Sequence, residues 1–127
     1  MKQIDRDRET AKNWTPVFDT TATLDNPSSM ISLYMRVLPA MTVAAYDHGY
    51  ALTRHGSMFR DLDLVAIPWQ EQHSDHHTLL CALQEAACGM SNLHYSPDKA
   101  QKPCGRKAYS FAIGLHAIVD VSITPAC

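Results

Sequence analysis

The apolar residues of this chain recur with two spacings, one typical of helices and one typical of strands. One set has members three or four positions apart, which places them on one face of a helix. Its members are Leu79, Leu80, Leu83, Ala86, Ala87 and Met90. Ser74 or Asp75 is suited to cap the first turn, and Gly89 is suited to end the helix in a left-handed conformation. The pattern therefore predicts a helix over residues 74–88.

Another helix is predicted over residues 37–48. Pro39 suits the first helical turn, residues 40–46 are mostly helix formers, and Gly49 is placed to cap the end. The apolar stretch just before, residues 31–38, fits either a short strand or the lead into this helix.

Two strands are predicted between these helices. The first covers residues 50–54 and is followed by a turn at Gly56-Ser57. The second covers residues 61–67 and is stopped by Pro68, which cannot donate a hydrogen bond within a sheet.

Two further strands are predicted at the end of the chain. Residues 91–106, which contain two prolines and a glycine, are predicted to form a long loop. Large apolar and smaller side chains alternate over residues 109–113, Gly114 suits a turn, and an apolar segment covers residues 117–123. Together these features predict a β-hairpin. The order of elements indicates an α+β fold: a small mixed sheet of about four strands, with two helices covering one face.

Length and composition indicate one domain. The chain has 127 residues, enough to bury a core without staples. Residues 1–29 are polar and have too few apolar side chains to offset their ordering entropy. We therefore expect a polar N-terminal extension that lies over the domain or is partly disordered, and a single domain over residues 30–127.

Charge, hydropathy and cysteine content indicate which ligands and which cellular compartment to expect. A formal net charge of −2 argues against binding duplex nucleic acid chiefly by electrostatics. The N-terminus is charged, and no apolar run approaches the roughly 18 residues that a membrane span needs. We expect a soluble, cytoplasmic protein whose four cysteines are free thiols.

Three aspartates are the main candidates for chemistry. Asp61 and Asp63 open a predicted strand and point to the same face, where two like charges repel unless a cation lies between them. Asp120, on a later strand, is a possible third carboxylate. Mg²⁺ prefers such oxygen ligands together with phosphates and water, and phosphoryl or nucleotidyl transfer needs metal ions to neutralise phosphate charge. The trio thus predicts a magnesium site, and a solvated sheet face is the alternative.

Phosphate-binding groups lie next to these carboxylates in the sequence. Gly56 allows close approach of the backbone to phosphate, and Ser57 offers a hydroxyl and an amide. Arg54 and Arg60 are suited to pair with phosphate oxygens.

These residues resemble the signature of the polymerase-β-like nucleotidyltransferase superfamily. The matching pieces are Gly56-Ser57 after a strand, Asp61-Leu62-Asp63-Leu64 opening the next, and Val119-Asp120-Val121 on a later one. The resemblance implies a nucleotidyltransferase-like core in which the Gly-Ser turn holds a nucleoside triphosphate. It implies that Asp61 and Asp63 bind Mg²⁺ and that Asp120, the third carboxylate, helps to activate the acceptor hydroxyl.

One departure from that signature leaves two functions open. Only three residues separate Ser57 from Asp61, where superfamily members usually have a longer segment with a helical turn. The first function is a magnesium-dependent nucleotide-binding protein or minimal nucleotidyltransferase, active or catalytically degenerate. The chain also resembles small phage and prophage proteins. The second function is accordingly a non-catalytic phage-encoded binding protein or inhibitor that acts on a host protein or defence complex.

Other candidate sites are weaker. His73, His77 and Cys81 are spaced four apart and would suit zinc on one helix stripe, but small buried positions explain the cysteine equally well. The basic residues Lys102, Arg106 and Lys107 suit phosphate, an acidic partner or solvent. Trp69 suits stacking on a base or half-burial at a strand end.

Overall fold

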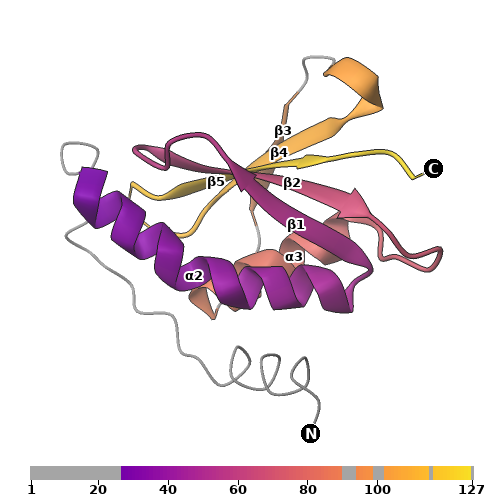
Figure 1. Ribbon diagram of the computed structural model, residues 1–127, viewed down its shortest axis with the longest axis horizontal. Helices are drawn as coiled ribbons and strands as arrows, with labels where there is room; N and C mark the ends of the chain where they lie inside the picture. Colours follow the sequence, from indigo (N-terminus) through magenta and orange to yellow (C-terminus); the bar gives the residue numbers. More distant parts are fainter. Residues whose placement is uncertain (1–26, 90–93, 99–101, 115, 127) are drawn as a thin grey trace, which may run out of the picture.

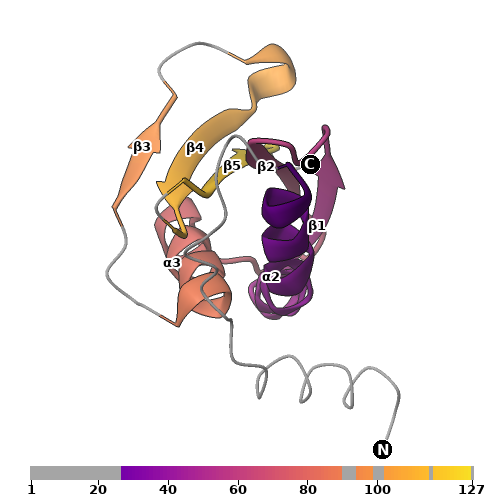
Figure 2. The ribbon, with the colours of Figure 1, turned by 90° about the vertical axis from the view of Figure 1, so that its left-hand side faces the viewer.

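Two helices and five strands make up the described parts of this computed structural model, which are residues 27–89, 94–98, 102–114 and 116–126 (Figure 1). The helices are α2 (Pro27–Asp47) and α3 (His76–Cys88). The strands are β1 (Tyr50–His55), β2 (Asp61–Pro68), β3 (Tyr95–Pro97), β4 (Lys107–Ala112) and β5 (Ile118–Ile123), with one turn of 3-10 helix at Pro103–Gly105. Both helices lie on the same side of the sheet (Figure 2).

The sheet has the strand order β1-β2-β5-β4-β3. β2 and β5 run parallel, and the other neighbouring strands are antiparallel. The expected α+β class, with two helices and a mixed sheet, is confirmed. The strand number is five rather than four, because β3 lies within the segment predicted as a loop and pairs with β4. Its Pro97 is tolerated because β3 is an edge strand.

Helix α3 is capped as its sequence predicts. The Asp75 carboxylate accepts a hydrogen bond of 2.7 Å from the Thr78 backbone N–H. Gly89 adopts a φ of 71° and donates its backbone N–H to the Glu85 carbonyl. The predicted helix over residues 74–88 is confirmed to within two residues.

The other helix is about ten residues longer than predicted. α2 begins at Pro27 rather than near residue 37, and Pro39 lies inside it instead of in its first turn. The segment before Pro39 is helical because its apolar residues continue the buried stripe, and this burial outweighs the missing proline N–H. Those buried residues are Met30, Leu33, Tyr34 and Val37, continued by Met41 and Ala45. Residues 27–29 of the expected extension thus belong to α2, and residues 1–26 lie outside the described part of the chain.

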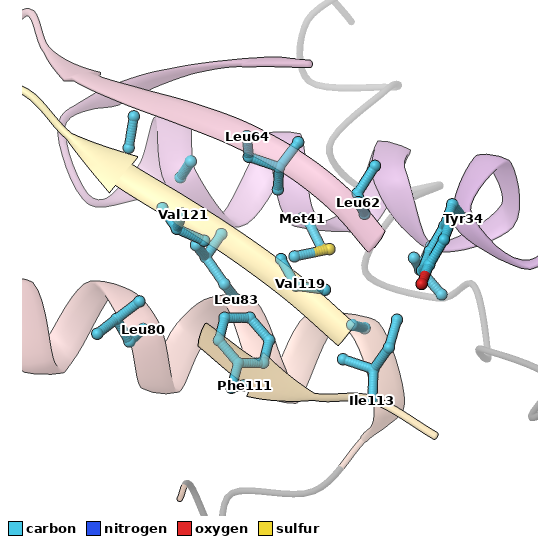
Figure 3. Packing of buried hydrophobic residues seen from close by; sticks show 14 of the residues in the cluster. Tyr34, Met41, Leu62, Leu64, Leu80, Leu83, Phe111, Ile113, Val119 and Val121 are labelled. Atoms are coloured by element: carbon cyan, nitrogen blue, oxygen red, sulfur yellow. The ribbon is translucent and has the colours of Figure 1, made fainter. Parts of the chain in front are cut away.

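The core lies between the helices and one face of the sheet. On β2 and β5, buried residues alternate with half-buried ones, so each strand turns every second side chain toward the helices. Figure 3 shows Leu62, Leu64, Val119 and Val121 directed toward side chains of the two helices. The other face of both strands carries the candidate aspartates.

Tyr34 joins the core to the edge of the sheet where β2 and β5 begin. Its side chain is fully buried, and its hydroxyl donates to the Arg60 carbonyl and accepts a 3.2 Å hydrogen bond from the Ile118 N–H. Burial is the main reason that the pKa of Tyr34 rises to about 12. One α2 side chain therefore holds the first residues of both strands.

Two further expectations concern cysteines and membranes. Cys81, Cys88 and Cys104 are reduced thiols, as predicted, and Cys127 lies outside the described residues. Within the described ranges, neither helix combines the length and apolar character needed to cross a bilayer.

Replacing Tyr34 with phenylalanine should lower the free energy of unfolding by about 2 kcal/mol, because the Arg60 carbonyl just before β2 and the Ile118 N–H at the start of β5 lose their partner. Urea unfolding measures the change. Tyr95→Phe is the control, since the Tyr95 hydroxyl makes only an exposed 3.4 Å contact with His77 Nδ1. Equal losses in the two variants would contradict the role assigned to Tyr34.

Candidate functional site on the open face of the sheet

The structure brings the three predicted aspartates together on the face of the sheet away from α2 and α3. Asp63 and Asp120 are direct partners in the parallel register of β2 and β5. Asp61 precedes Asp63 by two residues and therefore lies on the same face. All three side chains are half-buried. Strand pairing thus assembles a carboxylate cluster from two segments almost 60 positions apart in the sequence.

Repulsion and burial both act on this cluster. The pKa of Asp61 is raised, first by burial and then by the negative charge of Asp120. The pKa of Asp63 is raised by the same two causes, while the nearby His55 acts in the opposite direction. The cluster therefore favours bound protons or a bound cation over three bare negative charges.

Two polar residues that the sequence analysis did not single out complete the cluster. Ser110 on β4 is the register partner of Asp120 and donates a hydrogen bond to its Oδ1. His55 at the end of β1 pairs in register with Asp63 and lies on the same face. Neither residue has a local sequence signal, because each becomes relevant only through its partner on the next strand.

Gly56 lies against the Asp63 carboxylate. Its φ is 79°, and a Cβ at this position would approach Asp63 Oδ2 to 2.6 Å. The turn therefore needs glycine for its backbone conformation and for space. The Gly-Ser turn thus lies close to one of the three carboxylates.

The other predicted phosphate-binding residues lie in different environments. They are Ser57, Arg54 and Arg60. The Ser57 hydroxyl accepts a 3.2 Å hydrogen bond from the Phe59 N–H and so closes its own turn. Arg54 pairs in register with the buried Leu64, which places it on the helix side of the sheet, and its Nη1 donates to the Gly56 carbonyl. Arg60 is exposed, and its charge acts to lower the pKa of Asp61. Only Gly56 and Arg60 are thus next to a carboxylate.

A hollow of about 490 Å³ extends over this face from the carboxylates. Asp63, Asp120 and His55 line one part of it, and Lys102 and Arg106 line another. The remaining lining includes the small residues Ala108, Ser110 and Ser122, together with Tyr109, Val121 and Asp98. The hollow therefore combines negative and positive side chains around a floor of small residues.

The carboxylate oxygens suit magnesium but do not by themselves surround a metal ion. Across the described ranges, no group of three or more His, Cys, Asp or Glu side chains is arranged to hold a metal ion. Mg²⁺ commonly uses one or two carboxylates and takes its other ligands from water and substrate phosphates. Asp63 and Asp120, which face one another, fit that mode of binding.

The weaker candidates are dispersed. Cys81 Sγ lies 3.5 Å from His77 Nε2, but His73 lies before α3 and packs its ring against Tyr50. Trp69 is 48% exposed at the far end of β2 and contacts the ring of Tyr46.

Comparison of the chain with protein-family models, with curated proteins and with solved structures gave no match.

Gly56→Ala should destabilise the protein more than Gly89→Ala. Both glycines have a positive φ, for which alanine costs about 1 kcal/mol, but a Cβ at Gly89 meets nothing within 4 Å. The extra loss at Gly56 should shrink when Asp63 is also changed to alanine, and urea unfolding of the single and double variants measures this. Equal losses at the two glycines would contradict the contact with Asp63.

Asp63→Asn should stabilise the metal-free protein relative to wild type, increasingly as pH rises above about 4. A raised pKa means that the unfolded chain releases this proton at lower pH than the folded protein does. Rising pH therefore costs wild-type stability between the ordinary aspartate value of 3.8 and the raised pKa of Asp63, and asparagine avoids the loss.

The measurement is urea unfolding in EDTA at several pH values. Asp75→Asn is a control of opposite sign, because the Thr78 N–H lowers the pKa of Asp75 and its stabilising contribution is lost as pH falls through that pKa. Parallel pH profiles for wild type and Asp63→Asn would contradict the raised pKa of Asp63.

Proposed function

We propose that this chain is a magnesium-dependent nucleotide-binding protein with a nucleotidyltransferase-like core, acting in the cytoplasm. The observation that carries the proposal is the pairing of Asp63 with Asp120 across two parallel strands, with Asp61 on the same face. The sequence resemblance implies this pairing between its second and third signature pieces. Whether Asp63 and Asp120 are neighbours depends on how the strands pair in the tertiary structure and not on the local sequence.

The surroundings of the carboxylates support the same proposal. Gly56, from the first signature piece, touches Asp63, so all three pieces meet in one place. Ser110 orients the Asp120 carboxylate by its hydrogen bond. The hollow beside them is large enough for a small-molecule ligand and is polar along its floor.

The metal would be held by Asp63 and Asp120, with Asp61 beside them. Bound there, Mg²⁺ would neutralise phosphate charge on the substrate. Asp120 would receive a proton from an acceptor hydroxyl, as the resemblance implies; its hydrogen bond from Ser110 and its position in the lining of the hollow support this role. Nucleotidyl transfer is the reaction class that these residues fit.

One observation favours a non-catalytic variant of the same function. Only residues 56–60 connect β1 to β2, Met58 in this turn is buried with a φ of 61°, and the Ser57 hydroxyl is engaged by Phe59. Such a closed turn offers less room for phosphate than a longer loop would. A protein that binds nucleotide without turning it over, and so acts as a binding module or inhibitor, is therefore the second candidate.

Isothermal titration of ATP, GTP, CTP and UTP in excess Mg²⁺ tests the proposal. Wild type should bind at least one nucleotide and lose that binding in EDTA. Asp63→Asn should weaken binding by roughly tenfold or more, about 1.4 kcal/mol, because a metal ligand loses its charge. Glu85→Gln is the control, an equal change of charge at an exposed position on α3.

The outcomes separate the candidates. Silence from all four nucleotides, or equal affinity in Asp63→Asn, would contradict nucleotide binding at this site. Binding accompanied by pyrophosphate release in the presence of acceptor mixtures would support the transferase, and binding without release would support the non-catalytic module.

A further inference from the structure

We propose that Lys102 and Arg106 hold the phosphate tail of a magnesium-complexed nucleoside polyphosphate at the positive end of the hollow, the role that the resemblance to nucleotidyltransferases implies for the Gly56-Ser57 turn. This inference rests on the proposed function and specifies how the same site recognises its ligand.

The first argument is the position of the two basic residues. Both line the hollow that also reaches Asp63 and Asp120. Asp98, which pairs with Lys102, donates its backbone N–H to the Ala108 carbonyl. Ala108 is the register partner of Ser122, two residues beyond Asp120 along β5. Two residues of a strand span about 7 Å, so Ala108 lies about that far along the sheet from Asp120, and Arg106, two residues before Ala108, lies further in the same direction.

The second argument is the selection among neighbouring basic residues. Lys107 is adjacent to Arg106 in the sequence but pairs in register with the buried Ile123, on the helix side of the sheet. Its charge acts on His76 of α3, in agreement with that side. Arg54 is likewise on the helix side. The register therefore places Lys107 on the other side of the sheet, whereas Lys102 and Arg106, on either side of the 3-10 turn before β4, line the hollow.

The third argument is the anchoring of these two side chains. Arg106 donates its Nε to the Pro103 carbonyl at 3.3 Å, which holds the guanidinium at the rim of the hollow. Lys102 Nζ lies 2.8 Å from Asp98 Oδ2. Arginine presents several donors in a plane and suits phosphate oxygens, and lysine adds a point charge. The salt bridge to Asp98 partly neutralises Lys102 while the site is empty of anion.

The fourth argument is charge complementarity over the whole hollow. A fitting ligand must bring positive charge to Asp63 and Asp120 and negative charge to Lys102 and Arg106. A polyphosphate with a bound Mg²⁺ has both within one molecule. Between Asp120 and Arg106, the register positions on this face of β4 and β5 carry the small side chains Ser110, Ala108 and Ser122, which line the hollow.

The test compares ATP, AMP and inorganic tripolyphosphate, each titrated calorimetrically with excess Mg²⁺ into the full chain. Wild type should bind ATP and tripolyphosphate at least roughly tenfold more tightly than AMP. The double variant Lys102→Gln/Arg106→Gln should lose most of that preference, because the phosphate tail has lost its partners. Asp98→Asn should strengthen binding of ATP, since it releases Lys102 from its salt bridge.

Lys107→Gln is the matched control, with the same change of charge next to Arg106 but on the other side of the sheet. It should leave all three affinities unchanged. Ala108→Leu tests the hollow itself, since a larger side chain on its floor should weaken ATP and tripolyphosphate together. Urea unfolding of each variant shows whether it is folded.

The results distinguish this inference from the proposed function. If Asp63→Asn abolishes ATP binding while Lys102→Gln/Arg106→Gln keeps the wild-type preference for ATP over AMP, the inference is overturned and the proposed function stands. If Lys107→Gln is as damaging as the double variant, the inference is also overturned. If the double variant alone loses the preference, the inference is supported. If wild type binds neither ATP nor tripolyphosphate, both proposals are overturned.

Discussion

The parallel pairing of β2 with β5 is the constraint on which the rest of the structure depends. Parallel neighbours cannot be joined by a tight turn, so the chain between them must leave the sheet and return. It does so through α3, which covers the core, and through β3 and β4, which extend the sheet beyond β5. Tyr34 holds the starting residues of both strands by hydrogen bonds to Arg60 and Ile118. Register, core and candidate site therefore share one origin.

The same pairing has an unfavourable electrostatic consequence. Half-burial of the cluster, and then the negative charge of Asp120 nearby, raise the pKa of Asp61 and of Asp63. Ser110 and His55 reduce this repulsion but do not remove it. A chain under selection for stability alone would be better served by asparagine or serine at these positions. The retention of the three charges is more readily understood if a cation visits this face.

Much of the local structure could be predicted from the sequence. The cap at Asp75, the strand stopped by Pro68 and the hairpin around Gly114 each follow from residues close together in the chain. The predicted start of α2 is wrong because the prediction places the helix boundary near Pro39. Burial of apolar residues on both sides of Pro39 stabilises the helix by more than the missing hydrogen bond costs. β3 was missed because three residues carry no period of their own, and their pairing with β4 is tertiary.

The candidate site shows the same division. The shared side of Asp61 and Asp63 follows from their spacing on one strand. Asp120 on a later strand is a possible third carboxylate from the sequence, and the resemblance implies its role. The basic residues could not be sorted in this way. In the sequence, Arg54 and Lys107 are as suitable for binding phosphate as Lys102 and Arg106. The register places Arg54 and Lys107 on the helix side of the sheet, away from the hollow. Whether a charged residue belongs to the site therefore depends on the face of the sheet on which it lies.

The repulsion among the carboxylates bears directly on affinity. Any free energy that the empty protein loses to three neighbouring negative charges is recovered when a ligand brings a cation to them, because binding to the folded state alone stabilises it by mass action. The gain is available to a metal complex and not to a bare anion, which Asp63 and Asp120 would repel. At the other end of the hollow, Asp98 pairs with Lys102, and the proposed ligand would have to compete with this salt bridge. Together these two charge arrangements favour a ligand whose opposite charges are spaced along one molecule, and they do so before any contact with a base or sugar is considered.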